Sequence, residues 1–401
     1  MEYTTLLPWQ EISATGIVYT LGSLYDRFQQ ISDPRKAKGK QYSLLTLLVL
    51  IFLAKLAGKD KPVEIADWAK NHAAELAGLL GLKRQQMPHH NTYRRVFQSM
   101  ISVEEFEALL EEYHQQQNEA DGEVLCVDGK VMRGTRKGGE RSGEQVLSIY
   151  DGASQQVKAQ AMIANKENEI VAAPLLLAQV AVAGKVVTAD ALHTQREWCQ
   201  QIVSDQGDYV LPVKENQPRL HQDIARLFAP DQPKPGFGKI DTDFRSTKQV
   251  SYGHGRLEIR TIQTSAMLND YVDWPGLAQV YRLERQFFWL RQGQVYKSSV
   301  EVEFGITSLS RQRASPKRVL SLRRCQWQIE TGLHYRRDVT FHEDATRMTV
   351  GNAPAILSIV HNLALGLLKT AGFANAAAGR RYFEGHLHQA FALLLSPLPL
   401  S

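Results

Sequence analysis

The chain contains little cysteine and no cysteine pair. Among its 401 residues there are three cysteines, Cys126, Cys199 and Cys325, and they lie far apart. The sequence has no CxxC pair and no Cys/His zinc spacing, which argues against a zinc finger or a disulfide scaffold. We therefore expect reduced thiols and a cytoplasmic protein.

The chain also lacks a long apolar run. Its first residues, MEYTTLLPWQEIS, contain no basic region followed by an apolar core, so we expect no secretory signal. The most apolar stretch, SLLTLLVLIFLAKLA at 43–57, is too short to span a bilayer and contains Lys55. It predicts a buried helix, and we expect no membrane partner. The sequence shows no internal repeat and no low-complexity segment.

What remains is ordinary globular composition. Hydrophobic residues make up 43% of the chain and charged residues 22%, with a formal net charge of +5. A chain of this length and composition can form two or three domains with a sizeable core. The mild positive charge permits a polyanionic partner without requiring one.

The order of the expected elements divides the chain into four parts. Residues 1–118 read as helical, whereas 119–214 contain three strand-like runs and then alternating helix and strand. Residues 215–310 are rich in Pro and Gly and in short β-like stretches, which predicts a β-rich insertion. Residues 311–401 begin with a long helix and end in further helices. The fold class is therefore α/β, with a mixed sheet.

Two aspartates share one local setting. Asp128 and Asp190 each end an apolar strand-like run, and a polar loop follows. Because ligands gather at the carboxyl ends of strands in α/β sheets, neighbouring parallel strands would bring both carboxylates into one crevice. Their mutual repulsion would then favour a divalent cation, and hard oxygen ligands favour Mg²⁺ or Mn²⁺. The alternative for Asp128-Gly129 is a simple turn.

A third carboxylate stands out in the helix PKRVLSLRRCQWQIETGLHYRRDV. From Arg311 to Arg337, Glu330 is the single acid among many arginines, although a solvated helix normally mixes both signs. At helical spacing Arg323, Trp327, Glu330 and His334 share one face. The alternative is a local pair of Glu330 with Gln326 or His334, four residues away.

Three carboxylates around two divalent ions, beside a positive surface, are typical of phosphoryl transfer. One metal activates water or a 3′-hydroxyl, and the other stabilises the leaving oxygen. The basic residues would hold phosphates and would not read bases, so binding should depend on salt.

Seven motifs in order carry a family resemblance. They are DPRKAKGKQYSLLTLL, PHHNTYRRVF, VDGKVMRG, VVTADALHTQ, DYVLPVKENQPRL, HGRLEIR and WQIETGLHYRRDVTFHEDATR. Together, over about residues 20–370, they resemble the H-repeat-associated, ISAs-type group of DDE insertion-sequence transposases. The resemblance implies an RNase H-like mixed five-stranded sheet with flanking helices, a β-rich insertion, and an all-α N-terminal domain that binds DNA ends.

The resemblance also implies the chemistry. Asp128, Asp190 and Glu330 fall on the catalytic triad and would bind two Mg²⁺ ions, with Mn²⁺ as an alternative metal. The implied partners are double-stranded DNA, as terminal inverted repeats and as target, and further copies of the chain in a homodimer or larger assembly on DNA. The expected location is the bacterial cytoplasm, with the protein at the nucleoid when bound.

We also predict a set of DNA-binding residues. They are Lys130, Arg133, His193, Lys214, Asn216, His254, Arg256, Arg323, Arg324, Trp327, His334 and Arg337. Related transposases carry a lysine or arginine two helical turns after the glutamate, where this chain has Arg337. For Trp327 a place in the core is the alternative to base stacking. Glu258 in HGRLEIR is a rival for the third acid.

Three functions follow from these patterns. The first is a transposase that binds element ends, cleaves the DNA and joins 3′-hydroxyls to target DNA. The second is a domesticated DNA-binding protein without mobility, and the third is a two-metal endonuclease without strand transfer.

Overall fold

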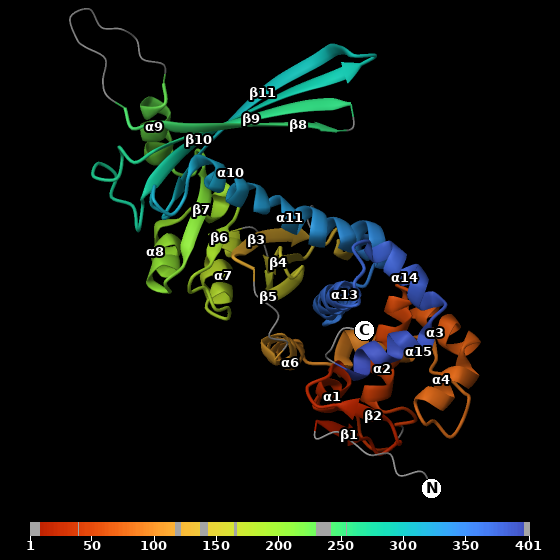
Figure 1. Cartoon of the computed structure of the whole chain (residues 1–401). Helices are drawn as coiled ribbons and strands as arrows, with labels where there is room; N and C mark the ends of the chain where they lie inside the picture. Colours follow the sequence, from red (N-terminus) through yellow and green to blue (C-terminus); the bar gives the residue numbers. More distant parts are fainter. Residues whose placement is uncertain are drawn as a thin grey trace, which may run out of the picture.

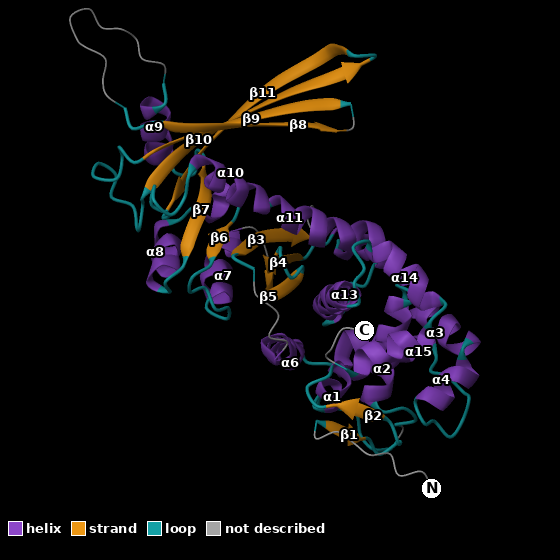
Figure 2. Ribbon diagram, in the orientation of Figure 1, coloured by secondary structure: helices purple, strands orange, loops and turns teal. Residues whose placement is uncertain are grey.

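The structure is a computed structural model of the chain. It describes residues 9–38, 40–116, 122–136, 143–163, 167–229, 242–253 and 255–396. A helical body containing both the N-terminal and the C-terminal helices lies at one end, a sheet flanked by helices lies in the middle, and a long group of strands projects from the sheet (Figure 1). Figure 2 separates the helical and the strand regions by colour.

The N-terminal region is a helical bundle with one small hairpin. Its elements are β1 (Gln10–Ile12), β2 (Val18–Thr20), α1 (Leu24–Gln29), α2 (Leu44–Leu56), α3 (Pro62–Asn71), α4 (Ala73–Leu79), α5 (His90–Arg95), the π-helical η1 (Val96–Met100) and α6 (Val103–Gln116). The buried helix predicted at 43–57 is confirmed as α2, which Ser43 caps. The expected all-α domain is corrected, because β1 and β2 pair around a turn in which Gly16 has φ +85°.

One hydrophobic core unites this bundle with the C-terminal helices α13 (Ala353–Thr370), α14 (Ala376–Glu384) and α15 (Leu387–Leu395). From Phe341 onward the residues predicted as the last catalytic part therefore also contribute to the core of the N-terminal bundle. By length and composition α13 could cross a membrane, but 83% of it is buried inside the protein. It is apolar because it is the central helix of this shared core.

A mixed sheet forms the middle of the molecule. Its strands are β3 (Val124–Val131), β4 (Gln145–Asp151), β5 (Gln156–Ile163), β6 (Val186–Thr188), β7 (Asp208–Val213), β8 (Arg245–Gly253), β9 (Arg256–Ser265), β10 (Gln279–Arg291) and β11 (Gln294–Thr307). Among the described residues the order is β5-β4-β3-β6-β7-β11-β10-β9-β8. β6 runs parallel to β3 and β7, and the other neighbours are antiparallel.

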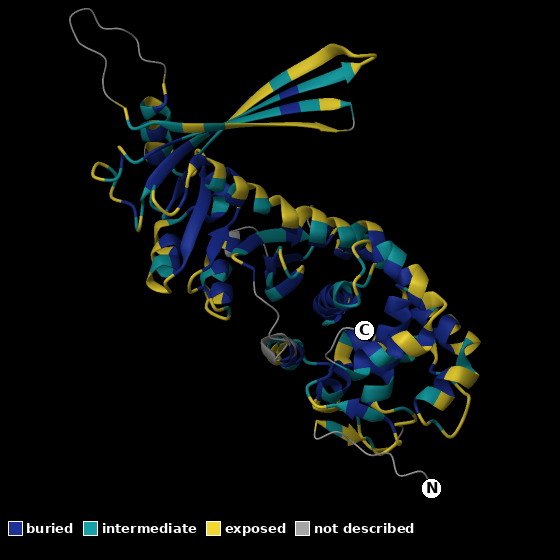
Figure 3. Ribbon diagram, viewed as in Figure 1, coloured by how far each residue is buried: buried dark blue, intermediate teal, exposed yellow. Residues whose placement is uncertain are grey.

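Over the described ranges these strands form one continuous sheet, in which the five strands β5-β4-β3-β6-β7 are joined by the four strands of the predicted insertion. The four strands of the predicted insertion do not form a separate unit, because β11 pairs with β7 from Phe304↔Val213 to Thr307↔Val210. Beyond that pairing β8–β11 continue outward as a long, twisted, largely exposed extension (Figure 3). We call residues 245–263 and 282–303 the blade.

The side chains of the sheet alternate between two helical layers. On one face Leu125, Val127 and Val187 pack in a core with α7 (Glu167–Leu177), α8 (Arg196–Ser204) and α9 (Pro218–Leu227). On the other face lie α10 (Pro316–Cys325) and α11 (Trp327–Ile329), which contact Cys126 and Val186. Alternation therefore turns even-numbered residues of β3 and β6 toward α10 and α11.

The helix over this second face changes its winding as it continues. After α11 the chain forms two π-helical segments, η4 (Glu330–His334) and η5 (Arg336–Thr340), before the short α12 (Glu343–Thr346). A π-helical turn is wider than an α-helical one and often marks a functional site. It also shifts the direction of every side chain that follows.

Candidate functional site

Alternation and register bring Asp128 and Asp190 together. Cys126 in β3 pairs with Thr188 in the parallel strand β6, so the two aspartates stand two residues beyond the same pair. Asp128 faces the layer of α10 and α11, and the negative charge of Asp190 acts on it. The expectation that Asp128 ends its strand is corrected, since β3 continues to Val131 in pairing with β4. It is the pairing with β6 that ends, and this leaves an opening beside Asp128.

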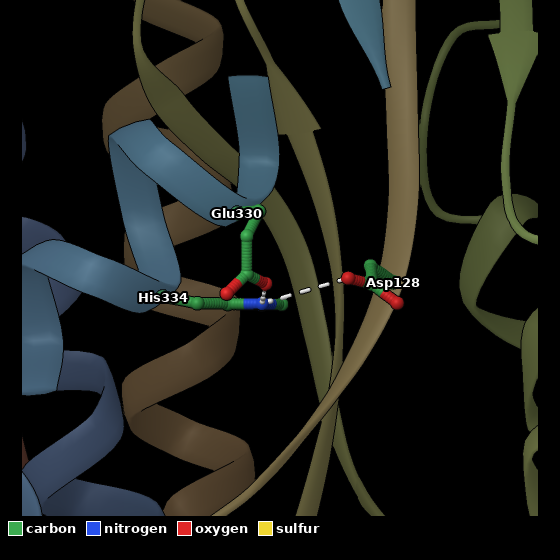
Figure 4. Close-up of side chains that lie close together, drawn as sticks. All are labelled: Asp128, Glu330 and His334. Atoms are coloured by element: carbon green, nitrogen blue, oxygen red, sulfur yellow. Dashed lines mark hydrogen bonds and ion pairs between the residues drawn. The ribbon is translucent and has the colours of Figure 1, made fainter. Parts of the chain in front are cut away.

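Glu330 and His334 enter this opening from the π-helical turn η4. His334 Nδ1 lies 3.2 Å from Glu330 Oε2 and 3.5 Å from Asp128 Oδ2. Figure 4 shows the three side chains pointing toward one another from the helix and from β3. Glu330 thus makes the local pair with His334 that helical spacing allowed, and it also faces Asp128.

The field at Asp128 favours a bound cation. Burial, together with the negative charges of Asp190 and Glu330, raises the pKa of Asp128 to about 7. The hydrogen bond from His334 lowers the pKa of Glu330, while burial lowers the pKa of His334. A cation between the carboxylates would remove the repulsion.

The donor set matches a divalent metal ion. Ligand atoms of Asp128, Glu330 and His334 lie within 4.8 Å of one another. Two carboxylates and an imidazole suit Mn²⁺ and, through their oxygens, Mg²⁺. His334 Nε2 is buried and makes no hydrogen bond to the described residues. The side chain of Asp190 is 56% exposed and its Oδ1 accepts the Leu192 N–H, so it borders the set from the open side.

A further carboxylate lies behind Asp128. Glu169, near the start of α7, is buried, and its negative charge contributes to the raised pKa of Asp128. Its Oε2 lies 3.7 Å from His193 Nε2, and a Cβ on Gly129 would meet its Oε1. Sequence reasoning missed Glu169 because an acid at the start of a helix is common.

Six of the predicted DNA-binding residues are exposed. They are Arg133, Lys214, Asn216, Arg256, Arg324 and Trp327, and Trp327 is 68% exposed. Core packing, the alternative for Trp327, is therefore excluded. Arg324 lies on the outer side of α10 and donates to Gln249 of the blade at 2.9 Å. These side chains remain available to a phosphate backbone.

Three predicted DNA contacts are corrected, because each cation is held by a protein carboxylate. Lys130 is buried and lies 2.7 Å from both oxygens of Asp338. Arg323 donates two hydrogen bonds to Glu303 at 2.8 and 3.0 Å. Arg337 is fully buried and bidentate to Glu343. The π-helical turns cause the last error, since α-helical spacing would leave Arg337 on an exposed face.

His193 and Asn216 lie next to Asp190 and the loop that follows it. His193 is buried beneath Asp190 at 4.0 Å, so its prediction as a DNA contact is also corrected. Asn216 donates through Nδ2 to the Ala191 carbonyl at 2.7 Å and holds the loop that follows Asp190.

The rival carboxylate lies away from the site. Glu258 is buried on the blade between Arg260, at 2.5 Å, and Arg256, at 3.6 Å. The Arg256 guanidinium also stacks over the Phe287 ring at 5.1 Å. His254 lies outside the described residues. Glu258 is therefore neutralised by arginines, in contrast to Asp128.

Two family models match the chain. Residues 119–367, more than half of the chain, match the family model described as transposase DDE domain. Residues 25–114 match the associated model described as DDE_Tnp_1-associated.

Individual relatives cover most of the chain. The Escherichia coli O157:H7 protein named "Putative transposase YncI" is 31% identical over 358 residues, 87% of this chain and 88% of that protein. The E. coli K12 protein named "H repeat-associated putative transposase YhhI" is 26% identical over 87% of this chain and 90% of that protein. A solved structure of a piggyBac transposase in a synaptic complex with hairpin DNA is also similar. The match covers 92% of this chain and 77% of that one, with 10% sequence identity and a TM-score of 0.41, which is too low to assign the fold.

Proposed function

Because the chain belongs to the transposase DDE domain family, we propose that it is a DNA transposase of the H-repeat-associated kind. It binds the ends of its element, cleaves the DNA and joins 3′-hydroxyl ends to target DNA. The observation that supports the proposal is that ligand atoms of Asp128, Glu330 and His334 lie within 4.8 Å of one another, while the negative charge of Asp190 acts on Asp128. On this proposal β5-β4-β3-β6-β7 is an RNase H-like core.

Family membership implies the use of divalent metal ions, and the side chains present fit them. Asp128 and Glu330 would hold one ion with His334. Asp190, whose negative charge acts on Asp128, would hold a second ion together with it. When bound, such ions lower the pKa of an attacking water or 3′-hydroxyl and stabilise the leaving oxygen. The 3.2 Å hydrogen bond between His334 Nδ1 and Glu330 Oε2 holds these two side chains side by side.

The remaining parts of the chain have proposed roles in DNA binding. Arg133, Lys214 and Arg324 would hold phosphates near the carboxylates, and the exposed Trp327 ring would stack on a base at the DNA end. The helical region, 1–118, would bind the inverted repeats. Two or more copies would assemble on two ends in the bacterial cytoplasm.

The test uses DNA that carries the inverted repeats bracketing the gene. We expect the purified protein to nick or cut at the ends with Mg²⁺ or Mn²⁺ and not with EDTA. We expect pre-cleaved ends to be joined to a target plasmid. Asp128→Asn and Glu330→Gln should abolish both reactions while sparing end binding, and Glu258→Gln should retain them. Activity in Asp128→Asn would refute the proposed site.

The same assay separates the two alternative functions. End binding without cleavage by the intact chain would favour a domesticated DNA-binding protein. Cleavage without joining would favour a two-metal endonuclease.

A further inference from the structure

One side-chain amide joins the three segments that carry the carboxylates of the site. Gln326 Nε2 donates to the Val127 carbonyl in β3 at 2.9 Å, and the Thr188 hydroxyl in β6 donates to Gln326 Oε1 at 2.8 Å. We call these two hydrogen bonds the Gln326 bridge. It uses both polar groups of the amide, so both hydrogen bonds depend on the same side chain.

The Gln326 bridge lies where two strands of the sheet separate. The parallel pairing of β3 with β6 ends at the pair Cys126↔Thr188, so Val127 is the first residue of β3 beyond it. Thr188 is fully buried. The Gln326 bridge therefore links the two strands at the edge of the opening beside Asp128.

The Gln326 bridge is also close in sequence to each carboxylate. Its two partners stand one residue before Asp128 and two residues before Asp190. Gln326 itself stands about one helical turn before Glu330. It has right-handed helical backbone angles, φ −52° and ψ −33°, and joins α10 to α11 without a break. Glu330, which reaches toward Asp128 from this helix (Figure 4), therefore moves with Gln326.

Two further contacts hold the same helix near the sheet, but they reach only β3 and β4. Cys126 Sγ donates to the Cys325 carbonyl at 3.1 Å. A Cβ on Gly332 would lie 2.5 Å from the Tyr150 hydroxyl, so the glycine lets the π-helical turn approach β4. Of these contacts, the Gln326 bridge is the one that includes β6, the strand that leads to Asp190.

Repulsion between the carboxylates opposes this arrangement when no metal ion is bound. Burial, together with the negative charges of Asp190 and Glu330, raises the pKa of Asp128 to about 7. Like charges at this spacing push the segments that carry them apart. The Gln326 bridge opposes this separation, and its hydrogen bonds use no carboxylate oxygen.

We propose that Gln326 is a positioning residue, whose side-chain amide sets the distances between Asp128, Asp190 and Glu330 for the binding of divalent metal ions. It acts through the two aspartate strands and the glutamate helix. The inference deepens the proposed function and rests on it, because it takes these carboxylates as the metal ligands. Groups that orient metal ligands contribute about tenfold to a hundredfold to metal affinity.

A second glutamine provides a matched control. Gln279 in β10 is fully buried, and its Nε2 donates to the Leu309 and Ala314 carbonyls at 2.7 and 3.2 Å. It therefore also links separate segments through one side-chain amide, but its partners are not next to any of the three carboxylates in the sequence. Loss of these hydrogen bonds should affect folding and not the carboxylate site.

The experiment measures the binding of Mn²⁺ alone to the full chain, without DNA. Electron paramagnetic resonance reports free Mn²⁺, and the binding that Asp128→Asn abolishes defines the carboxylate site. Gln326→Met keeps the length of the side chain but removes both hydrogen bonds, so it should raise the dissociation constant by at least about tenfold. Gln279→Met should leave the dissociation constant within about twofold of the wild-type value.

The Thr188 hydroxyl allows a second and milder test. Thr188→Val replaces the hydroxyl with a methyl group and should raise the Mn²⁺ dissociation constant less than Gln326→Met does, because the hydrogen bond to Val127 remains. Thr188→Ser keeps the hydroxyl and should bind Mn²⁺ like the wild type. Adding Thr188→Val to Gln326→Met should weaken binding no further, because the hydroxyl acts through Gln326.

The results separate positioning from general stability. All variants are compared where circular dichroism shows them folded, and Thr188→Val carries the test if Gln326→Met does not fold. Weaker Mn²⁺ binding in Gln326→Met or Thr188→Val, with wild-type binding in Gln279→Met and Thr188→Ser, confirms the positioning role. Wild-type binding in Gln326→Met, or equal weakening in Gln326→Met and Gln279→Met, overturns it and leaves the proposed function standing.

Failure of the proposed function gives a different result. If the wild type shows no Mn²⁺ binding that depends on Asp128, the metal site and the positioning role are both refuted. If Gln326→Met weakens an Asp128-dependent Mn²⁺ site in a chain that does not cleave end DNA, the transposase assignment fails and the positioning role stands.

Discussion

Two clusters that each join a glutamate to a histidine lie close together along the same stretch of chain. In the carboxylate site Glu330 and His334 meet Asp128, and the set remains partly open to solvent. The second cluster is wholly buried between the long helix and the N-terminal bundle. We call it the buried ion network, and its members are Arg337, Glu343, His361, Lys55, Asp60 and Arg380.

The difference lies in what neutralises the acids. In the network Arg337 lies 2.8 Å from Glu343, and Arg380 lies 2.7 Å from Asp60. Burial is the largest influence on the Glu343 carboxyl and opposes ionisation, but Arg337 and His361 outweigh it and lower its pKa. In the carboxylate site the neighbours of Asp128 are other acids, and its pKa rises to about 7. Unneutralised acids indicate a ligand site, whereas balanced acids indicate structure.

The largest expected effect separates the clusters by activity. Glu330→Gln removes a metal-binding oxygen and should lower DNA cleavage by about a thousandfold or more. Glu343→Gln leaves the site chemistry intact, so its folded fraction should cleave at a rate near that of the wild type. Cleavage is measured at 20 °C on end DNA, with rates corrected for the folded fraction by circular dichroism. Comparable losses of cleavage activity in the two variants would contradict the division into a catalytic and a structural cluster.

The reverse effect is expected for stability. Glu343→Gln leaves the buried Arg337 guanidinium without its carboxylate, and breaking one partner of a buried pair costs about 3–5 kcal/mol. Urea unfolding should show this loss. Glu330→Gln, at a half-exposed residue, is the control and should change the free energy of unfolding by less than about 1 kcal/mol.

A double substitution tests the cause. Arg337→Met combined with Glu343→Leu should recover much of the stability lost in Glu343→Gln, since no buried charge then lacks a partner. Failure to recover would mean that packing around Glu343, and not its charge, sets the loss.

The clusters should also respond to pH with opposite signs. Asp128 has a folded pKa of about 7, above its unfolded value near 3.9, so the folded chain holds the proton and stability falls as pH rises from about 4 to about 7. Burial and the Lys55 charge lower the pKa of His361 to about 3, below an unfolded value near 6.5. Its contribution is therefore lost as pH falls through that range.

These signs can be measured in EDTA by urea unfolding between pH 4.5 and 8. The stability of Asp128→Asn relative to the wild type should rise with pH by roughly 3 kcal/mol. The stability of His361→Gln relative to the wild type should fall with pH over the same range. If the free energy of unfolding of a variant changed with pH in parallel with that of the wild type, the pKa shift assigned to the substituted residue would be wrong.

Much of the carboxylate site follows from local patterns in the sequence. Val124 to Val127 predicts a strand, and alternation then fixes the face of Asp128. The lone acid in a basic helix singled out Glu330. His334 was expected on the same face, although as a DNA contact. Each of these inferences needs only neighbours in sequence.

What could not be predicted depends on contacts between distant residues or on helix winding. The pairing of β11 with β7 makes the predicted insertion part of the sheet, and no local signal marks that pairing. The π-helical turns redirect Arg337 toward Glu343, whereas a reading at 3.6 residues per turn places it outside. The packing of α13 in the core of the N-terminal bundle likewise depends on contacts between residues that are far apart in the sequence.

The smallest expected effect compares two adjacent arginines on α10. Arg323 is held by Glu303, whereas Arg324 is exposed and makes one hydrogen bond to Gln249. If Arg324 contacts a phosphate, Arg324→Gln should lower the slope of log K against log salt by about 0.9 for end DNA and weaken binding alike for unrelated DNA. Filter binding at salt concentrations from about 50 to about 200 mM gives the slope, because DNA affinity falls steeply over this range.

The matched variant is Arg323→Gln. It should leave the salt slope unchanged, because its positive charge is already compensated by Glu303, and it should instead lower the free energy of unfolding by breaking a half-buried bidentate pair. An unchanged slope in Arg324→Gln would remove this residue from the DNA path. A changed slope in Arg323→Gln would mean that Glu303 releases it on DNA, and that the rule separating balanced from unbalanced charges fails at this helix.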